Sequence, residues 1–542
     1  MSNEYIQKAE KIIEEMKIVY KNDDRPWVIG YSGGKDSTTV VQLVFTMLMQ
    51  LSPEERHKDV YVVSSDTLIE NPIVLAYLRE NSKLIGEGAK EKDLRLYTNM
   101  IHPDYDNTYW TNIIGKGLPT PTSIKFRWCT SRLKINPSNK FIEEKVKENG
   151  EVVVLLGVRK AESIARSIRI KNREIDGYIL TPHPILDNTY VYNPIVELTT
   201  EDVWGILLSN NGAAPWGGSN NDLFTLYAGG DGGECPFTTT NDKDTPSCGN
   251  SRFGCWVCTV VNKDKSLTGF IKSGEEWLQP LLDFREWLIG IRNKHEYRMQ
   301  YKRDGSHYYT KLYLSKLSLL DDYIINPDII FADNNNEGYI DLKNSQSEIE
   351  KGNIRKSDDK DKVYLEMLPL ITTNNSDDIR LDKSKIQEDE NGQYVNVLGY
   401  GPFNFVGRQL ILRKLLELNK LINEEFEIDL ITLEELEAID KIWDEEEDLS
   451  RRTLVDLYYE VTGERLPWDE YKKPMFDETT LNEITNLCEK HNLDTGLITK
   501  LLIQTNKYKH FTNKTVLDKS ITKILNARHL HKSVFEEIEN DN

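Results

Sequence analysis

Cysteine is scarce in this sequence, and the few thiols present are unevenly spread. Only six cysteines occur in 542 residues, and four of them lie between positions 235 and 258. Six thiols are too few for a disulfide scaffold, which excludes the disulfide-rich secreted class. In a reducing compartment such clustering indicates a metal site.

Long apolar runs are also missing. No uninterrupted run approaches the ~20 residues that a membrane span requires, so we expect no membrane association. The first five residues, Met1–Tyr5, have neither the basic region nor the apolar region of a secretory signal. We therefore expect a cytoplasmic protein.

Basic residues are too few to balance the acidic ones. Lys and Arg total 68 against 88 for Asp and Glu, so the formal net charge is -20. The resulting field repels polyanions such as DNA, and a nucleic-acid site must therefore be local or supplied by a basic partner. A content of 39% apolar and 29% charged residues excludes a wholly disordered chain. At ~150 residues per domain, the length suggests about three units and excludes a single small module.

Strand and helix patterns alternate through the first half of the chain. Short apolar runs at positions 28–31, 59–63, 94–97 and 152–156 predict strands, and stretches at 38–51 and 137–148 predict helices. Strands that read as continuous Val and Leu runs are typically buried on both faces. We predict an α/β fold with a doubly wound parallel sheet, and ligands beyond the carboxyl ends of its strands.

Composition divides the chain into four parts. We place an α/β domain at 1–230, a cysteine-rich loop with a basic and aromatic helical segment at 231–330, a low-complexity insertion or linker at 331–396, and a helical domain at 397–542. The third part is rich in Asn, Asp, Ser and Lys. The fourth repeats apolar residues at helical spacing but carries no motif.

Two charged stretches have two interpretations each. Between Glu424 and Asp448, 13 acidic residues accompany one basic residue, which predicts a solvated helical face or, as the alternative, a dock for a basic partner. From Phe284 to Lys311, cations alternate with aromatic rings, which predicts a local nucleic-acid footprint or an amphipathic helix with core aromatics. The cations are Arg285, Arg292, Lys294, Arg298, Lys302, Arg303 and Lys311.

A glycine turn follows the first predicted strand. Its residues are Ser32, Gly33, Gly34, Lys35, Asp36 and Ser37. The glycines allow a sharp turn, while free N–H groups and the dipole at the helix start favour an anion. A Walker A loop would require glycine in place of Ile29 and Ser or Thr in place of Asp36. The string resembles instead the PP-loop of ATP pyrophosphatases, which hold the pyrophosphate end of ATP and open it at the α-phosphorus; the alternative is a structural turn.

Polar residues follow two later strands. Asp66 and Thr67, after the second strand, are placed to bind Mg²⁺, water or ribose, or to cap a helix. Gly157, Arg159 and Arg166 follow the 152–156 strand. The two arginines could clamp phosphate bidentately, with Glu162 orienting a guanidinium, or form ordinary surface ion pairs.

The clustered cysteines are Cys235, Cys248, Cys255 and Cys258, in a loop rich in Gly, Pro, Asn and Thr. Such a loop has little apolar content of its own, so a metal centre held by four thiolates would supply its order. The set suits tetrahedral zinc and a [4Fe–4S] cluster equally well, and spacing alone leaves both open.

Cys129 stands apart from this set. Arg127, Arg132 and Lys134 surround it in the sequence, which predicts a lowered thiol pKa and a role as nucleophile or sulfur carrier. A buried inert thiol and an alternative cluster ligand are the other interpretations. Cys488 lies in a helical apolar pattern and is predicted to be core.

The motifs together resemble known families between about residues 24 and 288. The PP-loop, Trp128-Cys129, Lys134 and the segment from Gly157 to Arg166 resemble the phosphoadenylyl-sulfate (PAPS) reductase family. With the four clustered cysteines, the layout is similar to the DndC family, the sulfurtransferases of bacterial DNA phosphorothioation. The resemblance implies an adenine nucleotide alpha hydrolase-like fold, ATP pyrophosphatase activity with ATP and Mg²⁺, and a [4Fe–4S] cluster in preference to zinc.

The resemblance also implies roles and partners. Lys35, Asp36, Arg159 and Arg166 would serve adenylation, and Cys129 is our hypothesis for the sulfur carrier. DNA would be the substrate, a cysteine desulfurase the sulfur donor, and DndD and DndE companion proteins. The rival functions are an adenylyl-sulfate or PAPS reductase, whose mobile Glu-Cys-Gly-Leu-His tail is not found here, a tRNA thiolation enzyme, and a non-enzymatic zinc scaffold.

Overall fold

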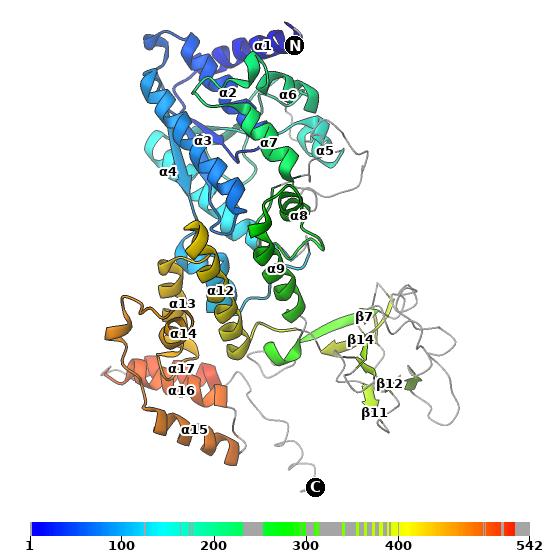
Figure 1. Ribbon diagram of the computed structural model, residues 1–542, viewed down its shortest axis with the longest axis vertical. Helices are drawn as coiled ribbons and strands as arrows, with labels where there is room; N and C mark the ends of the chain where they lie inside the picture. Colours follow the sequence, from blue (N-terminus) through cyan, green and yellow to red (C-terminus); the bar gives the residue numbers. More distant parts are fainter. Residues whose placement is uncertain are drawn as a thin grey trace. The chain divides into compact units, whose positions relative to one another are not determined.

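The structure is a computed structural model that groups the chain into two compact units. Unit 1 comprises Met1–Asn112, Thr120–Leu288 and Leu415–Ala438, and unit 2 comprises Ile113–Pro119, Ile289–Lys414 and Ile439–Asn542 (Figure 1). The structure describes residues 3–525 except 124–125, 163, 173–174, 176, 231–252, 293, 300–307, 314–338, 342–353, 357–362, 366–370, 374–378, 383–386, 390–391, 399, 492, 494 and 511–513.

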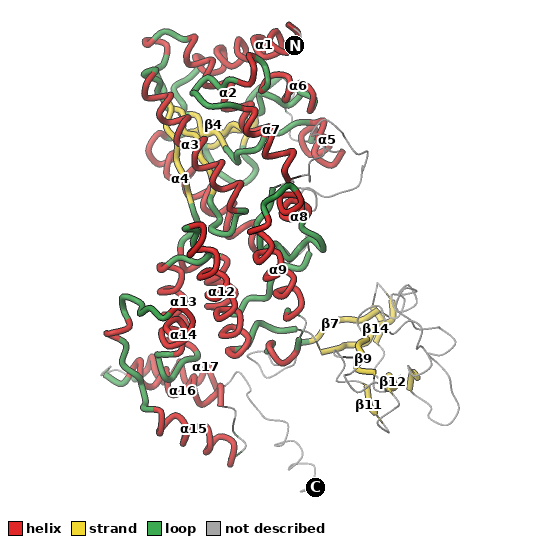
Figure 2. Tube along the Cα trace, in the orientation of Figure 1, coloured by secondary structure: helices red, strands yellow, loops and turns green. Residues whose placement is uncertain are grey.

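A six-stranded sheet forms the centre of unit 1 (Figure 2). Its strand order is β3-β2-β1-β4-β6-β5, and neighbouring strands run parallel except β5 and β6. This confirms the predicted parallel α/β sheet. The strands are β1 Trp27–Gly30, β2 Val60–Ser65, β3 Leu96–Ile101, β4 Val152–Leu155, β5 Thr181–Pro182 and β6 Thr189–Tyr192.

Alternating side chains of β1 pack on the two faces of the sheet. Val28 joins Val152, Val154 and Ile142 of α4 in one buried cluster. Trp27 packs instead edge-on against Tyr20 of α1, with ring centroids 5.2 Å apart. Both faces are therefore covered, as a strand with an unbroken apolar run requires.

The helices of this part connect and cover the strands. α2 buries ten of its side chains, and α3 begins at Pro72 behind the capping residue Asn71. The helices are α1 Asn3–Lys21, α2 Lys35–Gln50, α3 Pro72–Glu91, α4 Asn136–Asn149, α5 Ile164–Lys171, α6 Thr200–Leu207, α7 Asn220–Gly230, α8 Lys265–Lys272 and α9 Gln279–Ile291. Two π-helices, Thr111–Gly115 and Thr130–Ile135, lie in the connection between β3 and α4.

Short strands occur in the predicted low-complexity segment, and one more, β7, lies before it in the segment that we predicted to be helical. They form antiparallel sheets with the orders β13-β14-β7, β11-β12-β8 and β10-β9. The strands are β7 Tyr309–Tyr313, β8 Tyr339–Asp341, β9 Ile354–Lys356, β10 Val363–Leu365, β11 Ile371–Thr373, β12 Ile379–Asp382, β13 Gln387–Asp389 and β14 Gly392–Leu398.

The C-terminal region is helical, as predicted. Its helices are α12 Phe405–Phe426, α13 Leu433–Glu446, α14 Thr453–Thr462, α15 Glu478–Lys490, α16 Thr495–Tyr508 and α17 Thr515–Leu525. Cys488 is 2% exposed in α15, which confirms its assignment to the core. Across the part of the chain that the structure describes, none of the helices has the length and apolarity needed to cross a membrane.

We predicted that the acidic run forms a solvated helical face. This prediction is wrong for the carboxylates that are buried. Glu435 and Asp440 of α13 and the following Asp448 are at most 3% exposed. Asp440 accepts from Lys472 Nζ at 2.6 Å and from Trp468 Nε1 at 2.8 Å, and Lys472 also contacts Asp444 at 2.7 Å. Burial raises the pKa of Asp440, and it raises that of Asp444 to about 6. The number of acidic residues was clear from the sequence. The sequence did not reveal that Lys472, which is distant along the chain, binds two of them, Asp440 and Asp444.

Candidate nucleotide and cysteine site

The glycine turn after β1 has the geometry of an anion-binding loop. Gly33 adopts a φ of +70°, which favours glycine, and Gly34 caps the N-terminus of α2. The backbone N–H of Ser32 donates to Ser37 Oγ at 3.2 Å, and that hydroxyl also lies 3.0 Å from the carbonyl oxygen of Gly34. The loop is thus closed on itself, with Lys35 and Asp36 in the first turn of α2. The predicted strand, loop and helix junction is confirmed.

The loop after β4 lies directly against this turn. Strand β1 lies between β2 and β4, so the strand order reverses here, which is where ligands of open α/β sheets bind. A Cβ on Gly157 would lie 2.8 Å from the carbonyl carbon and oxygen of Asp36 and 2.9 Å from the backbone nitrogen of Ser37. Only glycine allows this approach, so Gly157 sets the spacing of the two loops.

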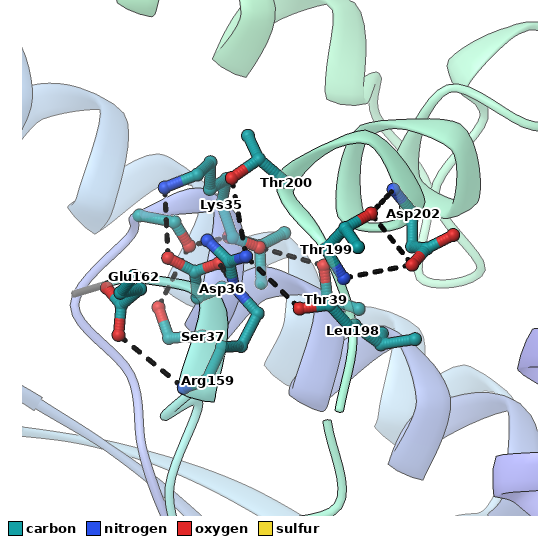
Figure 3. A network of polar contacts seen from close by, with 12 residues as sticks. Lys35, Asp36, Ser37, Thr39, Arg159, Glu162, Leu198, Thr199, Thr200 and Asp202 are labelled. Atoms are coloured by element: carbon teal, nitrogen blue, oxygen red, sulfur yellow. Dashed lines mark hydrogen bonds and ion pairs between the residues drawn. The ribbon is translucent and has the colours of Figure 1, made fainter. Parts of the chain in front are cut away.

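A charged network joins the two loops (Figure 3). Arg159 is 1% exposed, and its Nε donates to Asp36 Oδ1 at 2.6 Å. Lys35 Nζ lies 3.0 Å from the other oxygen of Asp36. Arg159 Nη1 donates to the carbonyl oxygen of Leu198 and to Thr200 Oγ1, both at 3.3 Å. Asp36 thus links the two predicted cationic residues.

This network corrects the prediction for the guanidinium of Arg159. We predicted a bidentate phosphate clamp oriented by Glu162, but Asp36 supplies the orienting carboxylate, while Glu162 accepts from the backbone N–H of Arg159 at 3.5 Å. Because the guanidinium is buried among protein oxygens, Arg159 braces the glycine turn at residues 32–37, which we call the phosphate loop after the PP-loop that it resembles. Arg166 lies in α5, and its side chain lies outside the described residues.

The turn after β2 holds Asp66 and Thr67. Asp66 is 3% exposed, accepts from the backbone N–H of Leu68 at 2.8 Å and contacts Arg79 Nη2 at 2.8 Å. The helix-capping alternative is wrong, because Asn71 caps α3 and accepts from the N–H of Ile73 at 3.0 Å. The two residues therefore shape a loop at the carboxyl edge of the sheet.

The second half of the cysteine set docks on this same turn. Cys255 forms a β-bridge with Glu70, and Trp256 donates its backbone N–H to the carbonyl oxygen of Ile69 at 3.1 Å. Thr67 Oγ1 lies 3.9 Å from Cys255 Sγ, and the N–H of Cys258 donates to the carbonyl oxygen of Cys255 at 3.0 Å. Cys235 and Cys248 lie outside the described residues. The structure thus joins the Cys255–Cys258 pair to the edge of the sheet that carries the phosphate loop.

Cys129 lies near this pair, although it precedes it by more than a hundred residues. Trp128 stacks on the buried Tyr109 with centroids 5.6 Å apart, and the hydroxyl of Tyr109 donates to the carbonyl oxygen of Val257 at 3.5 Å. Burial and the nearby Cys258 raise the pKa of Cys129. The predicted lowering of this pKa is therefore wrong.

The cations around Cys129 explain the difference. Arg132 contacts Asn112 Oδ1, and Lys134 lies 2.9 Å from Glu70 Oε1. Their charge is shared with protein acceptors, while burial disfavours the thiolate.

No group of three or more His, Cys, Asp or Glu residues with metal-holding geometry occurs among the residues that the structure describes.

The predicted nucleic-acid footprint from Phe284 to Lys311 is wrong for two of its cations. Arg285 is 0% exposed and donates to the carbonyl oxygens of Cys258, at 2.7 Å, and Val261. Arg298 is 4% exposed and donates to the carbonyl oxygen of Gly401 at 2.5 Å. Arg285 instead holds residues 253–261, which we call the cysteine segment, because its guanidinium binds the carbonyl oxygens of Cys258 and Val261.

One residue of this site was missed by the sequence reasoning. The hydroxyl of Tyr227, in α7, accepts the backbone N–H of Lys35 at 3.2 Å. The two residues are 192 positions apart, and no motif or spacing marks Tyr227 as a neighbour of the loop.

Comparison with known protein families gives a match to the first part of the chain. Residues 26–260 match the family model of the phosphoadenosine phosphosulfate reductase domain. This segment spans the sheet, the phosphate loop and the Cys255–Cys258 pair. This part of the chain is therefore similar to a PAPS reductase domain.

One curated relative and several solved structures are similar to parts of the chain. An uncharacterized protein of Methanocaldococcus jannaschii is 25% identical over 279 residues, which span 50% of this chain and 44% of that relative. The PAPS reductase of Candida auris, in a phosphate complex, is 14% identical over 41% of this chain and 91% of that one, with a TM-score of 0.25. The U34-tRNA thiolase NcsA of Methanococcus maripaludis, with its [4Fe-4S] cluster, is 10% identical over 53% of this chain and 80% of that one, with a TM-score of 0.27.

Proposed function

We propose that this chain is an ATP-dependent sulfurtransferase of DNA phosphorothioation, which releases pyrophosphate and replaces a non-bridging phosphate oxygen of DNA by sulfur. One observation carries the proposal. The PP-loop-like turn after β1 and the Cys255–Cys258 pair on the turn after β2 lie at the carboxyl ends of adjacent strands of one sheet. The proposed activating site and the proposed thiol site would thus be held by one sheet.

The phosphate loop would serve the first step. A phosphodiester oxygen is a poor leaving group, so we propose that it attacks the α-phosphorus of ATP and displaces pyrophosphate. Lys35 and the N–H groups at the start of α2 would stabilise the charge on the departing pyrophosphate. Asp36, braced by Arg159, would keep Lys35 in position, and Asp66 and Thr67 are candidates for Mg²⁺ or ribose.

The thiols would serve the second step. The terminal sulfur of a persulfide attacks the activated DNA phosphorus, and AMP leaves. A second thiol then attacks the carrier sulfur, which releases the phosphorothioate and leaves a disulfide between the two thiols. An external thiol reductant reduces this disulfide before the next turnover. We propose Cys129 as the persulfide carrier, loaded by a cysteine desulfurase, because it lies close to the Cys255–Cys258 pair. DndD and DndE are the proposed companions on DNA.

The described half of the cysteine set, Cys255 and Cys258, fits a thiophilic metal centre. Cys255 and Cys258 lie in one turn, as a C-x2-C ligand pair requires, and burial raises the pKa of Cys255, so a cation would stabilise its thiolate. Cys235, Cys248, Cys255 and Cys258 would hold the proposed [4Fe–4S] cluster, and it would supply a binding site for sulfur.

The test follows both products. Anaerobically purified chain is incubated with ATP, Mg²⁺ and DNA, with and without the desulfurase and companion proteins, and pyrophosphate is measured beside phosphorothioate linkages by mass spectrometry. We expect both products with DNA. Linkages formed only on tRNA would reassign the substrate, and sulfite formed from PAPS would indicate the reductase instead, for which the buried Cys488 is a poor nucleophile.

A Cys129→Ser variant tests the sulfur carrier. We expect pyrophosphate release to continue while DNA sulfuration is lost, because serine forms no persulfide. Full sulfuration by this variant would contradict the role of Cys129. An unchanged absorbance near ~400 nm separates the carrier role from that of a cluster ligand.

A further inference from the structure

Tyr227 lies against the N-terminal turn of α2 and occupies one of its anion-binding donors. It is 6% exposed, and its hydroxyl accepts the backbone N–H of Lys35 at 3.2 Å. A Cβ on Gly34 would lie 3.4 Å from the same hydroxyl, and Lys35 Nζ lies 5.6 Å from the ring centroid. The phenol thus closely contacts the loop where we propose that pyrophosphate binds.

The contact with the N–H of Lys35 is one that a phosphate would compete for. N–H groups in the first turn of a helix have no partner within the helix and are the donors that bound phosphates use. A charged phosphate oxygen makes hydrogen bonds roughly twice as strong as a neutral hydroxyl does. Nucleotide binding is therefore expected to displace the hydroxyl of Tyr227 from this N–H.

The same ring also contacts the start of the cysteine segment. Phe253, two residues before Cys255, packs edge-on against Tyr227 with centroids 4.6 Å apart, and Trp204 packs against it at 5.3 Å. Phe253 in turn stacks on Phe270 of α8 at 6.5 Å. Since interiors are closely packed, a movement of the Tyr227 ring must be accommodated by Phe253 or Trp204.

We propose that Tyr227 is a positioning residue that couples occupation of the phosphate loop to the placement of the cysteine segment. Pyrophosphate oxygens take the N–H of Lys35, the phenol turns away, and Phe253 carries this movement to the turn that holds Cys255. The proposal rests on the proposed function in one respect, because the competing anion is the pyrophosphate end of ATP.

The test compares Tyr227→Phe with Tyr192→Phe in the full chain. Tyr192 is also a buried phenol, 2% exposed, and its hydroxyl contacts Glu15 Oε1 at 3.0 Å, so the control removes the same atom elsewhere. Calorimetry with inorganic pyrophosphate and with ATP, both with Mg²⁺, measures affinity. Removing the competing neutral hydrogen bond is expected to tighten binding about 3- to 10-fold in Tyr227→Phe and to leave Tyr192→Phe unchanged.

Hydrogen exchange measures the coupling. The N–H of Trp256 donates to Ile69 and reports on the docked cysteine segment. We expect pyrophosphate to change its exchange rate in the wild type and much less in Tyr227→Phe. A Phe253→Leu variant should keep the wild-type affinity and lose this response.

Each other outcome is decisive. Weaker binding by Tyr227→Phe would mean that the hydroxyl donates to the phosphate, and equal affinity and equal exchange responses in all variants would mean that no coupling exists; either overturns the inference. A wild-type chain that binds neither pyrophosphate nor ATP would overturn the proposed function itself.

Discussion

The phosphate loop and helix α13 are both rich in charged residues, yet they neutralise charge in different ways. In the loop, Asp36 lies between the cations of Lys35 and Arg159. In α13, Glu435 is 0% exposed, and its carboxylate accepts from a neutral donor, the backbone N–H of Thr432, at 3.0 Å. Burial raises the pKa of Glu435 to about 7. The difference teaches that a carboxylate's partners, and not the local density of charge, decide its state.

Arg159→Leu should have the largest effect on stability and activity, because it removes one of the two cations that bind Asp36 in the phosphate loop. Breaking a buried ion pair leaves the other charge poorly compensated, which costs about 3–5 kcal/mol of unfolding free energy. We also expect pyrophosphate release to fall on the order of 100-fold, because Lys35 loses its braced partner. Denaturant unfolding and a pyrophosphate assay measure the two effects.

The control for this variant is Arg79→Leu. Arg79 also binds a buried aspartate, Asp66 at 2.8 Å, but its side chain is 61% exposed. An exposed pair contributes about 0–1 kcal/mol, so the unfolding free energy should change little. Equal losses in the two variants would show that burial of the guanidinium is irrelevant.

Glu435→Gln tests the helix side of the comparison through pH. The pKa of Glu435 is about 7 in the fold, above its ordinary value of 4.5, so the wild type loses stability as pH rises through this interval. A shift of this size corresponds to about 3 kcal/mol. The amide cannot ionise, so Glu435→Gln should unfold at a higher temperature than the wild type at pH 8 and at a similar temperature at pH 5.

The neighbouring exposed Glu434→Gln is the control for that experiment. Its melting temperature should follow that of the wild type across the whole pH range. A Glu435→Gln variant that also follows the wild type would mean that Glu435 ionises normally in the fold.

Gly157→Ala tests whether the spacing of the two loops matters when every charged residue of the site is kept. The added methyl group would lie within 2.9 Å of the backbone of Asp36 and Ser37, so the two loops must move apart. We expect about 2 kcal/mol of destabilisation and roughly 10-fold slower pyrophosphate release, since all charges remain but their spacing changes.

Gly290→Ala is the matched control, because no atom lies within 4 Å of the added methyl group at this helical glycine. It should be neutral or slightly stabilising in the same assays. If Gly157→Ala were equally harmless, the close approach of the two loops would not matter for the site.

Local patterns predicted most of the framework. The glycine turn, the strands around it and the C-terminal helices follow from residues that are neighbours in sequence, and the structure confirms them. Contacts across the fold were predicted poorly. Arg285 and Arg298 stand among aromatic residues as a nucleic-acid contact would, but they bind backbone carbonyl oxygens of distant segments.

The sequence by itself determined the phosphate loop, the alternation of strands and helices and the spacing of the thiols, because short-range backbone geometry and hydrophobic periodicity encode these features. Only the tertiary structure decided that Asp36 binds Arg159, that Tyr227 occupies the N–H of Lys35 and that Glu435 is buried. Each of these depends on which distant residues meet after packing, and burial then sets the strength of every charge and hydrogen bond involved.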